Sequence, residues 1–160
     1  MNKVQKRILG KDESNTYDIL CYTFEPMEYQ KVAIFTFIAH GVEEQTSLAA
    51  YQLFEHMVNY DDVCQNSPVL DYMRKKVKLI VIPILNPYGL QNRTYGNVNQ
   101  VNSSRNFPYY WKEYESTESE YDKKGSAPFS EAETVILRDI CIENLGNVDF
   151  IIDCHTGDGW

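Results

Sequence analysis

The chain has 160 residues, of which 43% are apolar and 24% are charged, and this size and composition are typical of one globular domain. It carries 23 acidic and 15 basic side chains, and the resulting net charge of −8 argues against nucleic acid as a partner. The longest apolar run, residues 32–39, is too short to cross a bilayer, and the N-terminus lacks the apolar segment of a secretory signal. We therefore expect no membrane contact, and a location in the cytoplasm or within a larger assembly.

Apolar runs and helical spacing predict secondary structure elements that alternate along the chain. After a lead of residues 1–16, strands are expected at residues 17–24, 32–38, 77–82 and 150–154. The last three are apolar runs of the kind found in strands buried on both faces. Helical spacing predicts a helix around residues 50–58. An S-x-x-E pattern at residues 130–133 predicts a second helix, with Ser130 as its N-cap, that runs to about residue 144.

The remaining segments are predicted to be turns and loops. Residues 86–89, Asn-Pro-Tyr-Gly, have turn chemistry, and residues 109–129 form a long, polar, tyrosine-rich loop. The alternation of strands and helices indicates a single α/β domain over residues 1–160.

The four cysteines show no paired spacing that would indicate disulfides or a cysteine metal site. Three of them lie inside apolar runs, where a thiol behaves as a small hydrophobic side chain. We expect buried free thiols at Cys21, Cys64, Cys141 and Cys154.

Two of the three histidines follow predicted buried strands directly, at the position where open α/β sheets bind their ligands. His40 precedes Glu43 by three residues, and His155 ends the last strand. The pair alone is most often structural, but two imidazoles and one carboxylate form the His₂Glu set of catalytic zinc sites. His56 lies on the predicted helix without an acidic partner at metal spacing, and we interpret it as a surface or core-edge residue.

Five segments, in order and with fitting gaps, resemble the zinc carboxypeptidases, which have a mixed α/β sheet. They cover roughly residues 32–157. They are the H-x-x-E pair at residues 40–43, the P-x-x-N-P-x-G turn at 83–89, the N-S-S-R-N-F-P segment at 102–108, the S-E-A-E-T helix start at 130–134, and the I-D-C-H-T strand end at 152–156. The resemblance implies a mixed, largely parallel central sheet flanked by helices.

The resemblance also implies roles for individual residues. His40, Glu43 and His155 correspond to the zinc ligands. Arg105 corresponds to the arginine that grips the substrate's terminal carboxylate, and Arg93 falls near the arginine that polarises the scissile carbonyl. Ser104 and Asn106 fall within the segment that holds the carboxylate. A structural salt bridge for Arg105 and a solvated loop position for Arg93 remain as alternatives.

Several positions depart from the family pattern. Tyr88 and Asn102 replace aspartates, and Ser104 replaces an asparagine that helps to hold the carboxylate. These changes leave open whether the substrate is a peptide C-terminus or a bacterial cell-wall peptide. The family's general-base glutamate lies well beyond the second histidine ligand, and no residue up to Trp160 corresponds to it. The chain therefore resembles the N-terminal part of a larger catalytic domain, or a protein that lacks that region.

Together these features predict a Zn²⁺-dependent, metallocarboxypeptidase-like hydrolase that cleaves a peptide or amide bond near a carboxylate terminus. An amidohydrolase of the desuccinylase or aspartoacylase type is one alternative, and a non-catalytic module with a relic metal site is another. Neither Glu44 nor Asp153 is supported by a motif as the general base. We expect the chain alone to bind zinc, to hydrolyse weakly, and to tend towards self-association through unpaired strand edges.

Overall fold

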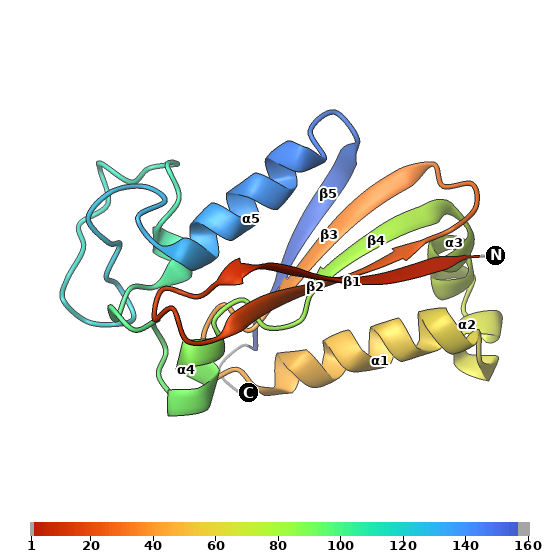
Figure 1. Cartoon of the computed structure of the whole chain (residues 1–160), viewed down its shortest axis with the longest axis horizontal. Coiled ribbons are helices and arrows are strands. Elements are labelled where there is room, and N and C mark those ends of the chain that lie inside the picture. Colours follow the sequence, from red (N-terminus) through yellow and green to blue (C-terminus); the bar gives the residue numbers. More distant parts are fainter. Residues whose placement is uncertain (1, 157–160) are drawn as a thin grey trace.

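A computed structural model describes residues 2–156 as three layers, with a five-stranded sheet between helices on its two faces (Figure 1). The strand order is β1-β2-β4-β3-β5. The strands are β1 (Lys3–Lys11), β2 (Asp18–Glu25), β3 (Lys31–Phe37), β4 (Val77–Ile82) and β5 (Val148–Cys154). The helices are α1 (Gln45–Asn59), α2 (Asp62–Asn66), α3 (Pro68–Lys76), α4 (Pro87–Asn92) and α5 (Ala132–Glu143), with a 3₁₀ turn at Ser103–Arg105.

The mixed α/β sheet predicted from the sequence is confirmed. β3 pairs in parallel with both β4 and β5, whereas β1 with β2 and β2 with β4 are antiparallel. Strand β1 lies inside the lead of residues 1–16, where the sequence predicted no element. Its residues are mostly exposed, so it lacks the apolar pattern that marks a buried strand.

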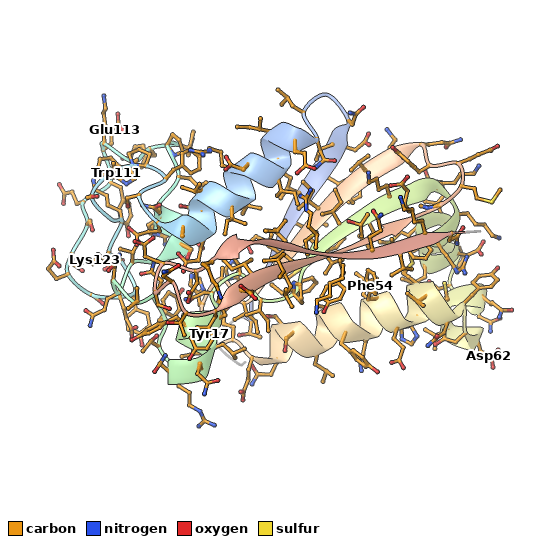
Figure 2. All side chains as sticks on the ribbon, in the orientation of Figure 1. Tyr17, Phe54, Asp62, Trp111, Glu113 and Lys123 are labelled. Carbon is orange, nitrogen blue, oxygen red and sulfur yellow. The ribbon has the colours of Figure 1, made fainter. Side chains whose placement is uncertain are left out.

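Apolar side chains fill the space on both faces of β3 and β4. On one face, Leu137 and Ile140 of α5 pack against a core that includes Ile34. On the other face, Ala50 and Met57 of α1 belong to the second core, and Phe54 points from α1 towards the sheet (Figure 2). The continuous apolar runs of β3 and β4 are explained by burial on both sides.

β5 differs from the prediction of a buried strand. Phe150, Ile151 and Ile152 are 40%, 49% and 40% exposed. β5 is the edge strand of the sheet formed by the described residues, so its apolar side chains have one neighbouring strand and little cover. The prediction of burial was therefore wrong for this strand, although its position was correct.

Two local predictions also need correction. The N-cap of α5 is Glu131, not Ser130, and the Ser130 hydroxyl instead donates to Glu131 Oε1 at 2.6 Å. The segment predicted as a turn at residues 86–89 begins the short helix α4, because Asn86 Oδ1 accepts a hydrogen bond from Gly89 N at 2.8 Å. Helices α2 and α3, capped by Asp61 and Ser67, were not predicted.

All four cysteines are free thiols, with Cys21 and Cys64 buried and Cys141 and Cys154 half-buried. None of the helices within residues 2–156 combines the length and hydrophobicity that a membrane-spanning segment requires.

Candidate metal centre

The parallel pairing of β3 with β5 sets the two histidines at one edge of the sheet. Phe37 lies opposite Cys154, so the two strands end level with each other, and His40 and His155 follow their ends. Between strand and histidine, Ile38 has a φ of 50°, a conformation that a β-branched residue rarely adopts. This residue turns the chain sharply at the end of β3.

The turn that carries His40 is held by the segment after β4. Leu85 N donates to Phe37 O and Asn86 N to Ile38 O, each at 2.9 Å. The chain then folds back on itself, with Glu43 N donating to His40 O at 3.1 Å. This tight turn brings Glu43 beside His40 just before α1 begins, at the same end of the sheet as α4 (Figure 1).

The side chains of His40, Glu43 and His155 converge on one centre. His40 Nδ1 lies 3.0 Å from Glu43 Oε1, and His155 Nδ1 lies 3.0 Å from Glu43 Oε2. The two Nδ1 atoms are 3.1 Å apart. His40 and Glu43 are buried, whereas the His155 side chain is about one third exposed, so one side of the centre is open to solvent.

Hydrogen bonds to the outer ring nitrogens indicate which nitrogen of each imidazole faces the centre. His40 Nε2 lies 3.0 Å from Asn102 Oδ1, and His155 Nε2 lies 2.8 Å from Asp153 Oδ2. Both oxygens are acceptors, so in the neutral imidazoles the proton is on Nε2 and the lone pair is on Nδ1. Asp153 is itself fixed by Thr36 Oγ1, which donates to its Oδ1 at 2.6 Å.

This arrangement fits a zinc ion. Two lone pairs and a carboxylate face one another at 3.0–3.1 Å, which is favourable only when a proton or cation lies between them. Tetrahedral ligands about 2.0–2.1 Å from zinc are about 3.3–3.4 Å apart, close to the distances observed. The residues that could hold the ion are therefore His40, Glu43 and His155.

The same contacts perturb two pKa values in the metal-free protein. The hydrogen bond to Asp153 raises the pKa of His155 to about 8, against burial, which lowers it. Burial raises the pKa of Asp153, but hydrogen bonds from His155 and Thr36 outweigh it and leave this pKa below its usual value. Protonated His155 therefore stabilises the metal-free fold below about pH 6.5, and this contribution is lost as the pH rises through about 8.

We predict that Gly41→Ala lowers the free energy of unfolding by about 3 kcal/mol. A Cβ at residue 41 would overlap the backbone of Gly89 in α4, which cannot move away without displacing the helix. Gly10→Ala is the matched control, because its Cβ would meet only the flexible end of Ile136 at 3.1 Å. Chemical denaturation gives the free energy of unfolding of both variants. Equal values for the two would contradict the close packing of α4 on this turn.

Of the predicted substrate-binding residues Ser104 and Asn106, only Ser104 contacts one of the three converging side chains. Ser104 Oγ is 3.4 Å from His40 Nε2, so Ser104 lies beside the centre. Asn106 is fully buried and its amide bonds Lys124 O and the start of α5 instead. In this structure the Asn106 amide therefore faces the start of α5, and its substrate-binding role stays a prediction.

The two arginines are exposed. Arg105 Nε donates to Tyr114 Oη at 3.2 Å, and within residues 2–156 its two Nη nitrogens donate no hydrogen bond. Arg93 caps α4 in the left-handed conformation, with a φ of 56°. The described contacts of Arg93 do not include the three converging side chains.

Sequence reasoning missed two residues that support His40. Asn102 was noted only as a departure from the family pattern, and Tyr95, whose ring stacks on His40 with centroids 3.8 Å apart, was not singled out. Tyr95 lies in a loop without periodicity, so no sequence signal pointed to it. His56, expected to lack a partner at metal spacing, bonds Asp61 Oδ2 at 2.6 Å.

The sheet and the cluster define an α/β protein with a candidate His₂Glu metal centre at the ends of parallel strands. A family model described as zinc carboxypeptidase matches residues 25–160, and the chain therefore belongs to the zinc carboxypeptidase family. No match to the sequence was found among curated proteins.

Solved structures with a similar fold are mostly carboxypeptidases. Carboxypeptidase A from Helicoverpa armigera has a TM-score of 0.75 and 18% identity, over 97% of this chain and 41% of that one. A metallo-carboxypeptidase from Burkholderia cenocepacia has a TM-score of 0.69 and 17% identity, over 96% of this chain and 36% of that one. An aspartoacylase family protein from Mesorhizobium loti has a TM-score of 0.59 and 16% identity, over 97% of this chain and 41% of that one. The chain thus spans 36–41% of the length of these structures, and the likeness is one of fold.

Proposed function

We propose that this chain carries the zinc centre of a metallocarboxypeptidase-type hydrolase, which cleaves a peptide or amide bond near a terminal carboxylate. The observation that carries the proposal is the convergence of two imidazole nitrogens and one carboxylate, with each imidazole already oriented by an outer hydrogen-bond acceptor. Membership of the zinc carboxypeptidase family supports the same reading. Zinc ligands are assigned to His40, Glu43 and His155.

We assign separate roles in metal binding and substrate binding to residues of this chain. A zinc ion held in this centre would supply Lewis acidity, which acidifies water and polarises a carbonyl. Asn102 and Asp153 keep the two imidazoles in the tautomer that binds metal. The Nη nitrogens of Arg105 present two parallel donors, which suit a substrate carboxylate.

Arg93 and Ser104 are assigned supporting roles in the proposal. Arg93 would donate to the developing oxyanion. Its side chain is exposed, and the residue directly follows α4, the helix that packs against the turn from His40 to Glu43. Ser104 would offer one hydroxyl near the carboxylate site. The carboxylates of Glu43 and Asp153 are both bonded to imidazoles, so neither is assigned as the general base.

Substrate assays on the zinc-loaded chain test the proposed reaction. We expect one zinc per chain and slow, zinc-dependent cleavage of a blocked dipeptide with a free carboxylate, about 10²–10⁴-fold below a rate assisted by a general base. Arg105→Lys should raise KM for this substrate about tenfold and leave the C-terminal amide unaffected. A cell-wall peptide with a free carboxylate provides the second substrate class.

Three outcomes would contradict the proposal. Absence of zinc binding would remove the centre, and equal effects of Arg105→Lys on free and amidated peptides would give Arg105 another role. Cleavage of an N-acyl amino acid without cleavage of any peptide would favour the aspartoacylase type instead. The similarity of fold to an aspartoacylase family protein makes this the alternative to include.

We also propose that the chain self-associates through β5. Phe150, Ile151 and Ile152 expose apolar surface on both faces of an edge strand, a combination that promotes pairing with another chain. We expect the sedimentation coefficient to rise with protein concentration and Ile151→Lys to suppress the rise. Val69→Lys, which changes another exposed apolar residue on α3, is the control. A concentration-independent monomer would contradict this role of β5.

A further inference from the structure

The tyrosine-rich loop contacts the residues around His40 through a short segment, residues 120–123, which we name the 120–123 strap. Glu120 Oε2 accepts hydrogen bonds from the backbone N–H groups of Tyr95 and Gly96, at 2.9 and 3.2 Å. Tyr121 O accepts from Asn102 Nδ2 at 2.7 Å, and Lys123 O accepts from Asn102 N at 2.8 Å. The strap is thus bonded to two separate points of the preceding loop.

Those two points are the residues that hold His40. Asn102 Oδ1 accepts a hydrogen bond from His40 Nε2, and the Tyr95 ring stacks on the His40 ring at 3.8 Å with an interplanar angle of 16°. The ring of Tyr121, a residue of the strap, also contacts the Tyr95 ring, with centroids 4.7 Å apart. His40 is therefore fixed at its edge and on its face by two residues that are both bonded to the strap.

An amide at position 102 is required for this connection. Asn102 Oδ1 accepts from His40 Nε2 and from Ser104 N, while its Nδ2 donates to a backbone carbonyl of the strap. A carboxylate at this position could accept the hydrogen bonds from His40 and Ser104, but it has no N–H to donate to Tyr121 O. Because the position is only 1% exposed, the lost hydrogen bond would be replaced by repulsion between the two oxygens. Asn102 thus couples His40 to the loop.

We propose that the 120–123 strap is a positioning element for His40, which acts through Asn102 and Tyr95. The proposal rests on the proposed function in one respect, because positioning His40 matters for metal binding only if His40 is a ligand. The strap does not touch the metal centre itself. Its effect is to restrict the rotation of an imidazole whose Nδ1 must point at the ion.

Glu120→Ala tests the proposal directly, because it removes the acceptor for Tyr95 N and Gly96 N. In the metal-free chain we expect the His40 Nε2 proton, followed by NMR, to exchange with solvent at least about tenfold faster. Zinc affinity, measured by competition with a chelator, should fall about tenfold, the lower end of the range for outer partners of a ligand. Glu120→Gln retains an acceptor oxygen and should restore both values. Glu113→Ala, an exposed carboxylate at the outer edge of the same loop, is the control (Figure 2).

Asn102→Asp is the second variant, which keeps an acceptor for His40 but removes the donor to Tyr121 O. We expect faster amide exchange in residues 120–123 than in wild type, with the His40 Nε2 proton still protected. Unchanged exchange of the strap in this variant, or unchanged His40 exchange in Glu120→Ala, would overturn the coupling. If the wild-type chain binds no zinc, the proposed function fails, while the exchange of the His40 proton still decides the role of the strap.

Discussion

Replacing Glu43 with Gln is expected to lower the zinc affinity of the chain by more than about 100-fold. Losing an outer partner of a ligand costs about 10–100-fold, and losing a ligand and its negative charge costs more. Gln has nearly the same shape, so the buried turn from His40 to Glu43 keeps its packing. Competition with a chromophoric chelator gives the affinity, and native mass spectrometry gives the stoichiometry.

Glu44→Gln is the matched control, because it removes the same charge from the next residue, which is exposed. Its zinc affinity should equal that of the wild type within about twofold. If both variants lose affinity equally, the effect comes from net charge near the site and not from a bond to the ion. If neither loses affinity, the converging side chains are not the zinc site.

The parts of the fold predicted correctly are those where burial imposes a pattern. β3 and β4 lie between two apolar cores, so nearly every residue is apolar and the strands are visible in the sequence. β1 follows no such pattern, since it pairs with β2 while most of its side chains face solvent. β5 has the composition of a buried strand, yet it is at the edge of the sheet formed by the described residues, and no local sequence feature reports the number of neighbouring strands.

The candidate site shows a similar division. His40, Glu43 and His155 could be predicted because they follow strands whose ends meet at one edge, and because a family pattern contains them. The contacts that support His40 could not be predicted, because Tyr95 and the 120–123 strap lie in segments without periodicity. The direction of the Asn106 amide, which bonds Lys124 O, could not be predicted either, because a motif gives the position of a residue and not its contacts.

The second large effect is expected for Asp153→Asn. Asp153 orients His155 and makes it a more basic ligand through a hydrogen bond of 2.8 Å to Nε2. An amide oxygen can still accept this bond, and Thr36 Oγ1 can accept from the new amide nitrogen, so the fold is retained. At about pH 9, where protons do not compete, we expect the variant to bind zinc at least about tenfold more weakly than the wild type.

The pH dependence of zinc binding separates this role from a purely structural one. His155 in the wild type has a pKa of about 8, so zinc must displace a proton below that pH, and affinity should fall roughly tenfold for each unit between pH 8 and 6.5. Without the Asp153 charge the pKa of His155 drops, proton competition begins at lower pH, and the two affinity curves should converge as the pH decreases. Asp149→Asn, on the same strand but bonded to Lys31, should follow the wild-type curve throughout. Parallel curves for wild type and Asp153→Asn would show that Asp153 supports the strand end and leaves the basicity of His155 unchanged.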